Sequence, residues 1–294
     1  MVNKLLMCPP DYFRADIPNN KWMEDLPKSK RKVNVEKAMA RFFDLYSLVS
    51  QGNLVYLVPP NPKFQDQVFT ADVGIVLPHL GDVAVLSNFR SEGRSGEELE
   101  VQDLLEKLGY TCYKSPYYFE GEAELKWIRE NIYIGGYGIK SDVQALEWIE
   151  SEFKVKVLKV ELSDEYLYHL DGSVFPLDRN HVVMYASDKN PEEVKEIGKH
   201  VKLIKIGKND AYQGLTNSVR SGLTVLNASN IAELPHSDKL HKYEAHKNKK
   251  LKEICDTFGL KLVHVNLSEF LKSGALLSCM VMHLNYDDLD LTAS

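Results

Sequence analysis

A helix followed by a strand recurs five times along this chain of 294 residues, and this repeat constrains the fold more than any other feature. In each unit, apolar residues at helical spacing give way to a short apolar strand. The predicted helices are 35–51, 97–108, 141–153, 192–199 and 247–258, and the strands that follow them are 54–58, 110–113, 155–160, 201–206 and 260–265. The units begin roughly 45 to 60 residues apart, a period typical of closed or stacked repeat architectures.

Periodicity alone leaves two architectures open, because a doubly wound sheet also alternates helices and strands. No glycine-rich phosphate loop follows any of the strands, and each unit carries a polar residue shortly after its strand. These residues are Asp72, Glu120, His169, Asn217 and Cys279. A ring of five units would bring these residues together at its centre, whereas a linear sheet would keep them far apart. We therefore expect an α/β fold with five-fold pseudo-symmetry, a five-bladed propeller formed by residues 1–294 as one catalytic domain.

Composition narrows the classes of function. The net charge of −6 argues against nucleic acid as a partner, and no apolar run approaches the length of a membrane span. The four cysteines show no metal-binding spacing and no apolar run opens the chain, which predicts free thiols in a reducing, cytoplasmic setting. We expect no metal and no organic cofactor. The expected partner is a small molecule, and assembly into a homo-oligomer stays open.

Cys279 is the candidate nucleophile. It follows a Ser-Gly-Ala break at 273–275 in an apolar surround, and no other cysteine lies within twenty residues. A thiol needs a base and an orienting group to act as a nucleophile. The alternative is a buried structural thiol, which is the usual role of a free cysteine. We assign that alternative to Cys8, Cys112 and Cys255.

A histidine and a carboxylate stand in settings that suit such partners. His169 and Asp171 alternate in a strand-end loop, so both side chains face one side of an extended chain. A lone histidine is more often structural, however. Glu120 follows an aromatic run and precedes a glycine, which suggests a carboxylate emerging from an aromatic wall. For Glu122 and Glu124 we expect plain solvent exposure.

Further charged residues suggest a cationic substrate. Asp66 and Asp72 share a face by parity, and Arg90 and Arg94 bracket a short loop that suits a substrate carboxylate, although most surface arginines are simply solvated. A cysteine protease has no need of so many acids at one mouth. A guanidinium offers five N–H donors in one plane and pairs with carboxylates bidentately.

Eight groups of segments, spread over nearly the whole chain, resemble segments that occur in the same order in one known family. They are 7–13 with 20–23; 68–72; 87–90 with Arg94 and Glu97; 119–121; 135–138; 169–171; 210–211 with Asn217; and 272–279. Together they resemble the guanidino-modifying, amidinotransferase-like family, which includes arginine deiminase, dimethylarginine dimethylaminohydrolase and arginine dihydrolase. The resemblance implies a five-bladed α/β propeller, in agreement with the five units.

The resemblance also implies roles for single residues. Cys279 would be the nucleophile and His169 the general acid and base. Glu120 and Asp72 would bind the guanidinium, with Asp171 as a further carboxylate beside them.

Other matching positions concern the substrate's surroundings. Arg90 would bind the amino-acid carboxylate, and Asn20 resembles the asparagine that replaces an acid near the guanidino group in arginine dihydrolase. Three departures stand out. Lys140 replaces an arginine that usually meets the substrate carboxylate, Ala123-Glu124 replaces Gly-Asp, and Ala275 replaces a glycine.

The function implied is hydrolysis of the guanidino group of L-arginine or a close analogue. A covalent thiouronium intermediate on Cys279 would lead to ornithine or citrulline plus ammonia. Transfer of the amidino group to an acceptor amine uses the same intermediate and stays open. So does a non-catalytic, arginine-binding sensor.

Overall fold

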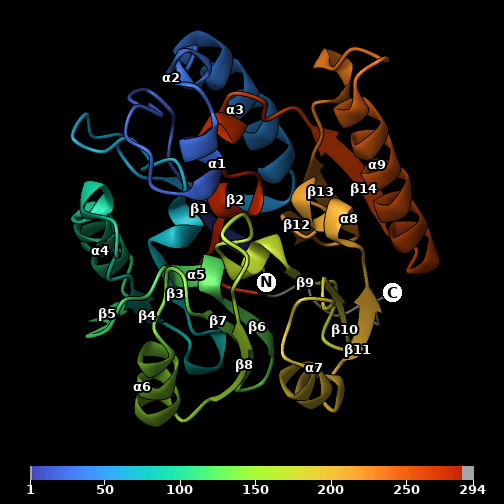
Figure 1. Ribbon diagram of the computed structural model, residues 1–294. Helices are drawn as coiled ribbons and strands as arrows, with labels where there is room; N and C mark the ends of the chain where they lie inside the picture. Colours follow the sequence, from blue (N-terminus) through green and yellow to red (C-terminus); the bar gives the residue numbers. More distant parts are fainter. Residues whose placement is uncertain (1, 287–294) are drawn as a thin grey trace.

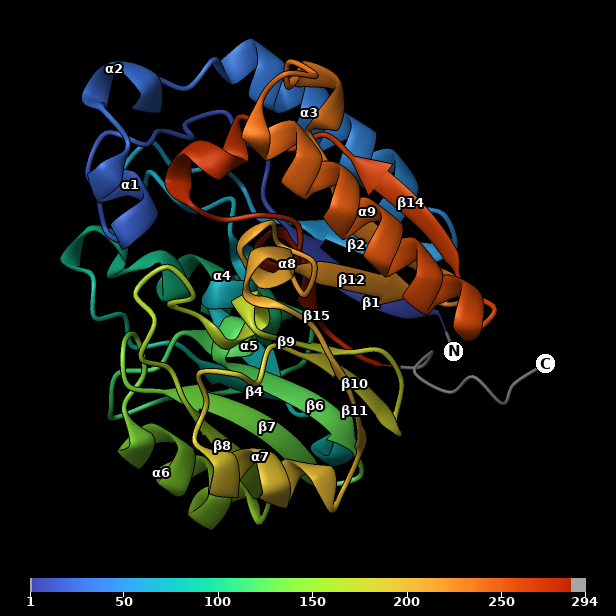
Figure 2. The same ribbon diagram turned by 45° about the vertical axis from the view of Figure 1, so that its right-hand side comes forward.

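The computed structural model describes residues 2–286, in which five three-stranded sheets surround a common centre (Figures 1 and 2). In every sheet the middle strand pairs antiparallel with one neighbour and parallel with the other. Parallel neighbours require a crossover connection, and a helix supplies it in each case. The fold is thus the predicted α/β ring of five units, and each sheet with its helix is called a blade.

The blades are numbered in the order of their helices. Blade 1 contains β1 (Asn3–Met7), α3 (Val35–Val49), β2 (Asn53–Leu57) and β15 (Met282–His283). Blade 2 contains β3 (Gly74–Val76), β4 (Val83–Leu86), α4 (Glu97–Lys107) and β5 (Thr111–Lys114). Blade 3 contains β6 (Leu125–Arg129), β7 (Ile132–Tyr137), α6 (Val143–Phe153) and β8 (Lys156–Glu161). Blade 4 contains β9 (Val174–Pro176), β10 (His181–Met184), α7 (Pro191–Gly198) and β11 (Lys202–Lys205). Blade 5 contains β12 (Ser218–Ser221), β13 (Thr224–Ala228), α9 (Lys239–Thr257) and β14 (Lys261–Val265).

Both ends of the described chain build blade 1. Leu5 of β1 pairs with Val55 of β2 on one side and with His283 of β15 on the other. The ring is therefore closed by hydrogen bonds between the first and last strands. The five long helices lie at the periphery (Figure 1).

The core consists of five apolar clusters, each packed between neighbouring blades. Alternation along the middle strands explains this arrangement, since successive side chains point to opposite faces. Leu5 of β1 packs in the cluster shared with blade 5, whereas Leu6 packs in the cluster shared with blade 2. Val182 and Val183 of β10 divide in the same way between blades 3 and 5. A strand buried on both faces reads as a continuous apolar run, as these do.

The helix in blade 5 is longer than predicted. It begins at Lys239, eight residues before the expected start, and the Asp238 side chain caps it by accepting from the Leu240 N–H. Five of the eight residues 239–246 are lysine, glutamate or histidine, and the stretch shows little apolar periodicity, so the pattern gave no sign of this extension.

The connections between blades lead to the centre of the ring. They contain the short helices α5 (Gly121–Glu124) and α8 (Lys208–Tyr212) and the 3-10 turns η1 (Thr70–Asp72), η4 (Leu170–Gly172) and η7 (Ser278–Met280). A further segment with α1 (Lys21–Asp25) and α2 (Lys28–Arg31) precedes α3. None of the helices within residues 2–286 combines the length and apolar character that crossing a membrane requires.

Candidate active site

The five polar residues singled out by the repeat meet at the centre of the ring. Asp72 ends η1, Glu120 precedes α5, His169 precedes η4, Asn217 precedes β12, and Cys279 lies in η7. Each is at most 6 % exposed. One residue thus comes from each inter-blade connection, as expected for a closed ring.

Cys279 is held by two side chains. Its thiol donates to Asp171 Oδ2 at 3.3 Å, and Asn217 Nδ2 donates to its sulfur at 3.5 Å. The neighbouring Ser278 repeats both contacts, because its N–H donates to Asn217 Oδ1 and its hydroxyl to Asp171 Oδ2. These four contacts fix the direction of the thiol. The sequence offered Asn217 as a polar residue at the right place in the repeat and as part of the resemblance, without a role, and no role was predicted for Ser278.

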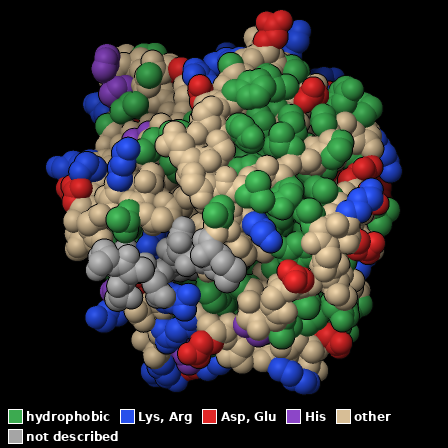
Figure 3. All heavy atoms as spheres, turned by 180° about the vertical axis from the view of Figure 1, so that it is seen from behind, with side chains coloured by type: hydrophobic (Ala, Val, Ile, Leu, Met, Phe, Trp, Pro, Cys, Tyr) green, Lys and Arg blue, Asp and Glu red, His purple; other side chains and the backbone are tan. Residues whose placement is uncertain are grey.

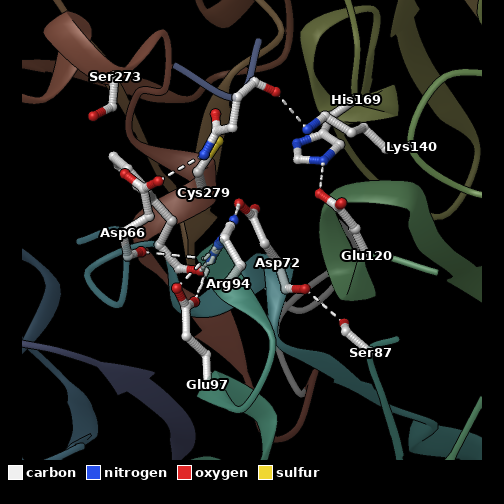
Figure 4. A network of polar contacts seen from close by, with 12 residues as sticks. Asp66, Asp72, Ser87, Arg94, Glu97, Glu120, Lys140, His169, Ser273 and Cys279 are labelled. Carbon is white, nitrogen blue, oxygen red and sulfur yellow. Dashed lines mark hydrogen bonds and ion pairs between the residues drawn. The ribbon is translucent and has the colours of Figure 1, made fainter. Parts of the chain in front are cut away.

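His169 and Glu120 form a buried pair in which the two atoms Nε2 and Oε2 lie 2.7 Å apart (Figure 4). Burial opposes charge on Glu120, yet Lys140 and His169 lower its pKa to about 2. Burial also opposes charge on His169, but Asp72 and Glu120 raise its pKa to about 9. Both shifts favour an imidazolium–carboxylate pair at neutral pH, in which the histidine carries a proton to give.

Several acceptors at this centre have no hydrogen-bond partner within residues 2–286. They are Asp66 Oδ1, Asp72 Oδ1 and Glu120 Oε1, and His169 Nδ1 is unpaired as well. Figure 4 shows these side chains grouped around Cys279. A buried carboxylate oxygen without a donor is costly, so such atoms indicate a place for a ligand that brings donors. Three carboxylates are suited to a planar cation with several N–H groups.

The thiol of Cys279 is held protonated in this environment. Burial, together with the negative charges of Asp171 and Asp72, raises its pKa well above the ordinary value of 9.0. A cation placed among the carboxylates would reverse that electrostatic effect, because an opposite charge nearby favours the thiolate. The nucleophile would then form only where a cationic ligand is bound.

Arg94 lies under the site, and the expectation that it binds a substrate carboxylate does not fit its contacts. It is 4 % exposed, and its guanidinium donates to Asp72 Oδ2 at 2.5 Å and to both oxygens of Glu97. Backbone oxygens of Asp66 and Phe69 take the remaining contacts. Arg94 therefore positions Asp72. The two residues do not share a helical turn, because Arg94 ends the 3-10 turn η3 (Glu92–Arg94) and Glu97 begins α4 after Gly96, whose φ is +103°.

Arg90 and Lys140 lie differently with respect to the centre. The Arg90 side chain is 43 % exposed, bonds Asp142 at 2.6 Å and covers the ring of Tyr118. Lys140 is buried and donates to the backbone oxygen of Asn19 at 2.8 Å. The charge of Lys140 lowers the pKa of Glu120, whereas Arg90 lies at the surface of the protein.

Asn20 joins the N-terminal segment to the cysteine loop. Its Nδ2 donates to the Ser273 oxygen at 2.9 Å, and its Oδ1 accepts from the Met23 N–H and so caps α1. Asn19 lies beside it and donates to Asp66 Oδ2 at 2.7 Å. This segment thus contacts Asp66 and the loop of Cys279, and the residue expected to bind substrate at position 20 is engaged with the protein itself.

Glu122 and Glu124 are buried, so the expectation of solvent exposure was wrong for both. Glu122 bonds the backbone N–H and the ring of His283, each at 2.7 Å. Glu124 Oε2 accepts from the Leu170 N–H at 3.2 Å, one residue after His169. Glu124 fits because Gly136 has no side chain, as a Cβ there would lie 2.5 Å from Oε2.

A cavity of about 490 Å³ lies beside the loops of His169 and Cys279. Its wall includes Leu167 and Gly172 from the loop of His169, and Gly274 and Leu276 from the loop of Cys279. The side chains of Cys279, His169 and Glu120 do not line it. Within residues 2–286, no three histidine, cysteine or acidic side chains are grouped so as to hold a metal ion.

A five-bladed α/β ring with a buried cysteine at its centre is the architecture of the guanidino-modifying, or pentein, superfamily, and the chain belongs to it. The bifunctional arginine dihydrolase/ornithine cyclodeaminase AgrE of Nostoc sp. is 30 % identical over 96 % of this chain and 38 % of its own length. The chain thus spans about two fifths of that relative. A dimethylarginine dimethylaminohydrolase of Mycobacterium tuberculosis is 26 % identical over 97 % of this chain and 86 % of its own. No family model matches the chain.

Solved structures agree with this assignment. The N-terminal domain of ArgZ, described as an arginine dihydrolase from cyanobacteria and bound to product, superposes with a TM-score of 0.84 at 28 % identity. The match covers 97 % of this chain and 98 % of that domain. A mutant of the same domain bound to substrate gives a TM-score of 0.83 at the same identity, with 96 % and 98 % covered.

Proposed function

We propose that this chain hydrolyses the guanidino group of L-arginine or a close analogue through a covalent adduct on Cys279, giving citrulline or ornithine plus ammonia. The observation that carries the proposal is the set of unpaired carboxylate oxygens of Asp66, Asp72 and Glu120 around a buried thiol. The similarity to arginine dihydrolases supports the choice of substrate.

Binding is the first step. The guanidinium lies flat among the carboxylates and donates to the oxygens that lack partners. Each charge-assisted contact contributes about 1.5–3 kcal/mol, because it replaces an unpaired buried acceptor. Arg94 keeps Asp72 in place, so this carboxylate meets the ligand without rearranging.

Attack on the guanidino carbon follows. The bound cation lowers the pKa of Cys279, and the thiol proton leaves through Asp171, which accepts from the sulfur at 3.3 Å. The thiolate forms the C–S bond, and His169 gives its proton to the departing ammonia. Glu120 stabilises the positive charge of the imidazolium before this transfer.

Water then completes the reaction. The neutral imidazole left after the first step takes a proton from water, which attacks the thiouronium carbon and releases Cys279. In a second round on citrulline, Cys279 attacks the ureido carbon and a second ammonia departs, which leaves a thiocarbamate. Water then releases Cys279 and the carbamate of ornithine, which loses carbon dioxide to give ornithine. The same histidine thus serves as acid and base in turn.

Substrate access requires a covering segment to move, since Cys279, His169 and Glu120 are at most 4 % exposed. The segment at Asn19 and Asn20 covers the centre, where Asn19 contacts Asp66 and Lys140 and Asn20 contacts the Ser273 oxygen. We propose that it opens to admit arginine. We also propose that residues 1–294 act as one catalytic domain, in the cytoplasm, in keeping with the free cysteines.

Intact mass spectrometry after brief incubation with arginine tests the proposal. The unmodified chain and Cys255→Ser should show an adduct and release ammonia, because Cys255 lies in an apolar cluster between blades 4 and 5. Cys279→Ser should show neither while still binding arginine. Turnover that persists in Cys279→Ser would refute the covalent step, and no reaction of the unmodified chain with arginine would refute arginine as the substrate. Added glycine separates amidino transfer from hydrolysis by the product formed.

A further inference from the structure

The last strand of every blade lies at the outer edge of its sheet and exposes two residues three positions apart. Because the five blades repeat one plan, these positions can be compared directly. The pairs are Leu54 and Leu57 in β2, Thr111 and Lys114 in β5, Lys156 and Lys159 in β8, Lys202 and Lys205 in β11, and Lys261 and His264 in β14. All are exposed except Lys159, which is partly exposed.

Four of these edges carry lysine, and β2 does not. Lysine on an edge strand prevents pairing with another chain, since the unpaired backbone groups of an edge are a template for strand addition. The sequence of β2 is Asn-Leu-Val-Tyr-Leu, without a charged residue. One of five equivalent edges therefore lacks the usual protection.

The two leucines of β2 are not required for the core. Val55 and Tyr56 between them pack against the clusters on either side of blade 1. Leu54 is 47 % exposed and Leu57 is 42 % exposed. Residues three apart on a strand point to opposite faces, so the leucines flank the edge on both sides. From behind, apolar side chains form a broad patch over the half of the molecule that holds blades 1 and 2 (Figure 3).

We propose that β2 is the contact surface between two copies of this chain, paired edge to edge about a two-fold axis. Two strands related by such an axis run antiparallel, and each offers the backbone donors and acceptors that the other needs. A neutral edge can lie against its own copy without repulsion. The edges of β8 and β11 carry two lysines each, so the same pairing there would bring lysine close to lysine, and like charges on facing strands repel. The edges of β5 and β14 carry one lysine each.

The charge pattern favours a second copy over a different partner. A partner of opposite charge would need a charged edge to recognise, and β2 offers none. An isologous contact requires only that the surface complement itself, which an uncharged strand with paired leucines does. The edge lies on the outside of blade 1, so pairing leaves the central residues untouched.

Light scattering of the purified chain over a dilution series tests this inference. The unmodified chain should show twice its mass of 33.5 kDa and fall to that mass on dilution. Leu54→Lys/Leu57→Lys, which gives β2 the pattern of β8 and β11, should stay monomeric at every concentration. Leu240→Lys is the matched control, since Leu240 is 49 % exposed on α9 in blade 5 and should leave the dimer intact.

Circular dichroism and thermal melting verify that each variant is folded. If the double variant does not fold, the single variant Leu57→Lys replaces it. An unmodified chain that is monomeric throughout overturns the inference. So does a double variant that associates as strongly as the unmodified chain. If Leu240→Lys dissociates the dimer as much as the double variant does, the inference is also overturned, because the effect is then not specific to β2.

Discussion

At the scale of single residues, we expect Lys140 to decide how the tail of the proposed substrate is held. It is buried near Glu120, whereas Arg90 stands exposed and bonded to Asp142. An ammonium is a point charge, and a guanidinium can grip a carboxylate through two parallel bonds. A lysine here should bind the α-carboxylate, but less strongly than arginine would.

Comparison of arginine with agmatine, which lacks the carboxylate, measures that contact. We expect the unmodified enzyme to prefer arginine in kcat/KM by tenfold or more, which corresponds to about 1.4 kcal/mol. Lys140→Arg should widen the preference, and Lys140→Met should reduce it more than Arg90→Ala does. Should agmatine be the better substrate, the assignment of arginine fails while the guanidino chemistry at Cys279 survives.

Glu124 should make stability depend on pH. Burial raises its pKa from 4.5 to about 8, so between these values the folded chain holds a proton that the unfolded chain has released. Stability should therefore fall as pH rises through this window. Glu124→Gln cannot ionise and retains an acceptor for Leu170. The free energy of unfolding of Glu124→Gln, measured by urea titration, should increase relative to that of the unmodified chain as the pH rises from 4.5 to 8.

Glu122 on the same short helix gives a control of opposite sign. Burial opposes its ionisation, but His283 and Lys126 hold its pKa below the ordinary value. A lowered pKa stabilises the folded chain above pH 4.5, so Glu122→Gln should be less stable than the unmodified chain at neutral pH. Equal pH profiles for the two variants would contradict these opposite shifts, because burial alone would then decide the ionisation of both carboxyls.

At the scale of elements, the contact between the N-terminal segment and the cysteine loop depends on Gly274. Its φ is +69°, and a Cβ there would lie 2.7 Å from Asn20 Oδ1 and 2.9 Å from Trp22 Cβ. Gly274→Ala should displace the covering segment. Gly259 is the matched control, with a φ of +66° and no atom within 4 Å of an added Cβ.

Both substitutions should lower the free energy of unfolding by about 1–2 kcal/mol, the cost of a left-handed alanine. Only Gly274→Ala should also reduce kcat/KM for arginine, since only that alanine clashes with Asn20. Steady-state kinetics and urea unfolding on the two variants measure both effects. Equal kinetics for the two would mean that the covering segment does not depend on this contact.

The sequence predicts elements better than it predicts their contacts. Apolar spacing located all five blade helices, because each buries one face against a sheet. It also placed Asp72, Glu120, His169 and Cys279 at equivalent points of the repeat, where the ring brings them together.

Burial of charge was harder to foresee. Glu122 and Glu124 were expected in solvent, since acidic residues are rarely buried and a four-residue helix leaves no periodic pattern. Arg94 was misplaced for a related reason. Its bond to Asp72 joins residues far apart in sequence, and only the folded chain shows that its donors are already taken.

At the scale of the whole molecule, the site is a junction of all five blades, because each connection between blades contributes one residue to it. A ligand held by these residues should therefore stabilise the ring as one unit. Arginine at a hundredfold excess over its Kd adds about 2.7 kcal/mol to the stability of the state that binds it. For a chain of this size, we expect the Tm of Cys279→Ser to rise by about 5 °C in a single transition.

Differential scanning calorimetry of Cys279→Ser with and without arginine measures the shift while preventing turnover. Asp72→Asn in the same background should reduce the shift, because the amide presents one acceptor fewer to the guanidinium and brings donors of its own. Two separate transitions, with only one displaced by arginine, would contradict the coupling of the blades through the site. A single transition that arginine leaves unmoved would instead place its binding elsewhere than among these carboxylates.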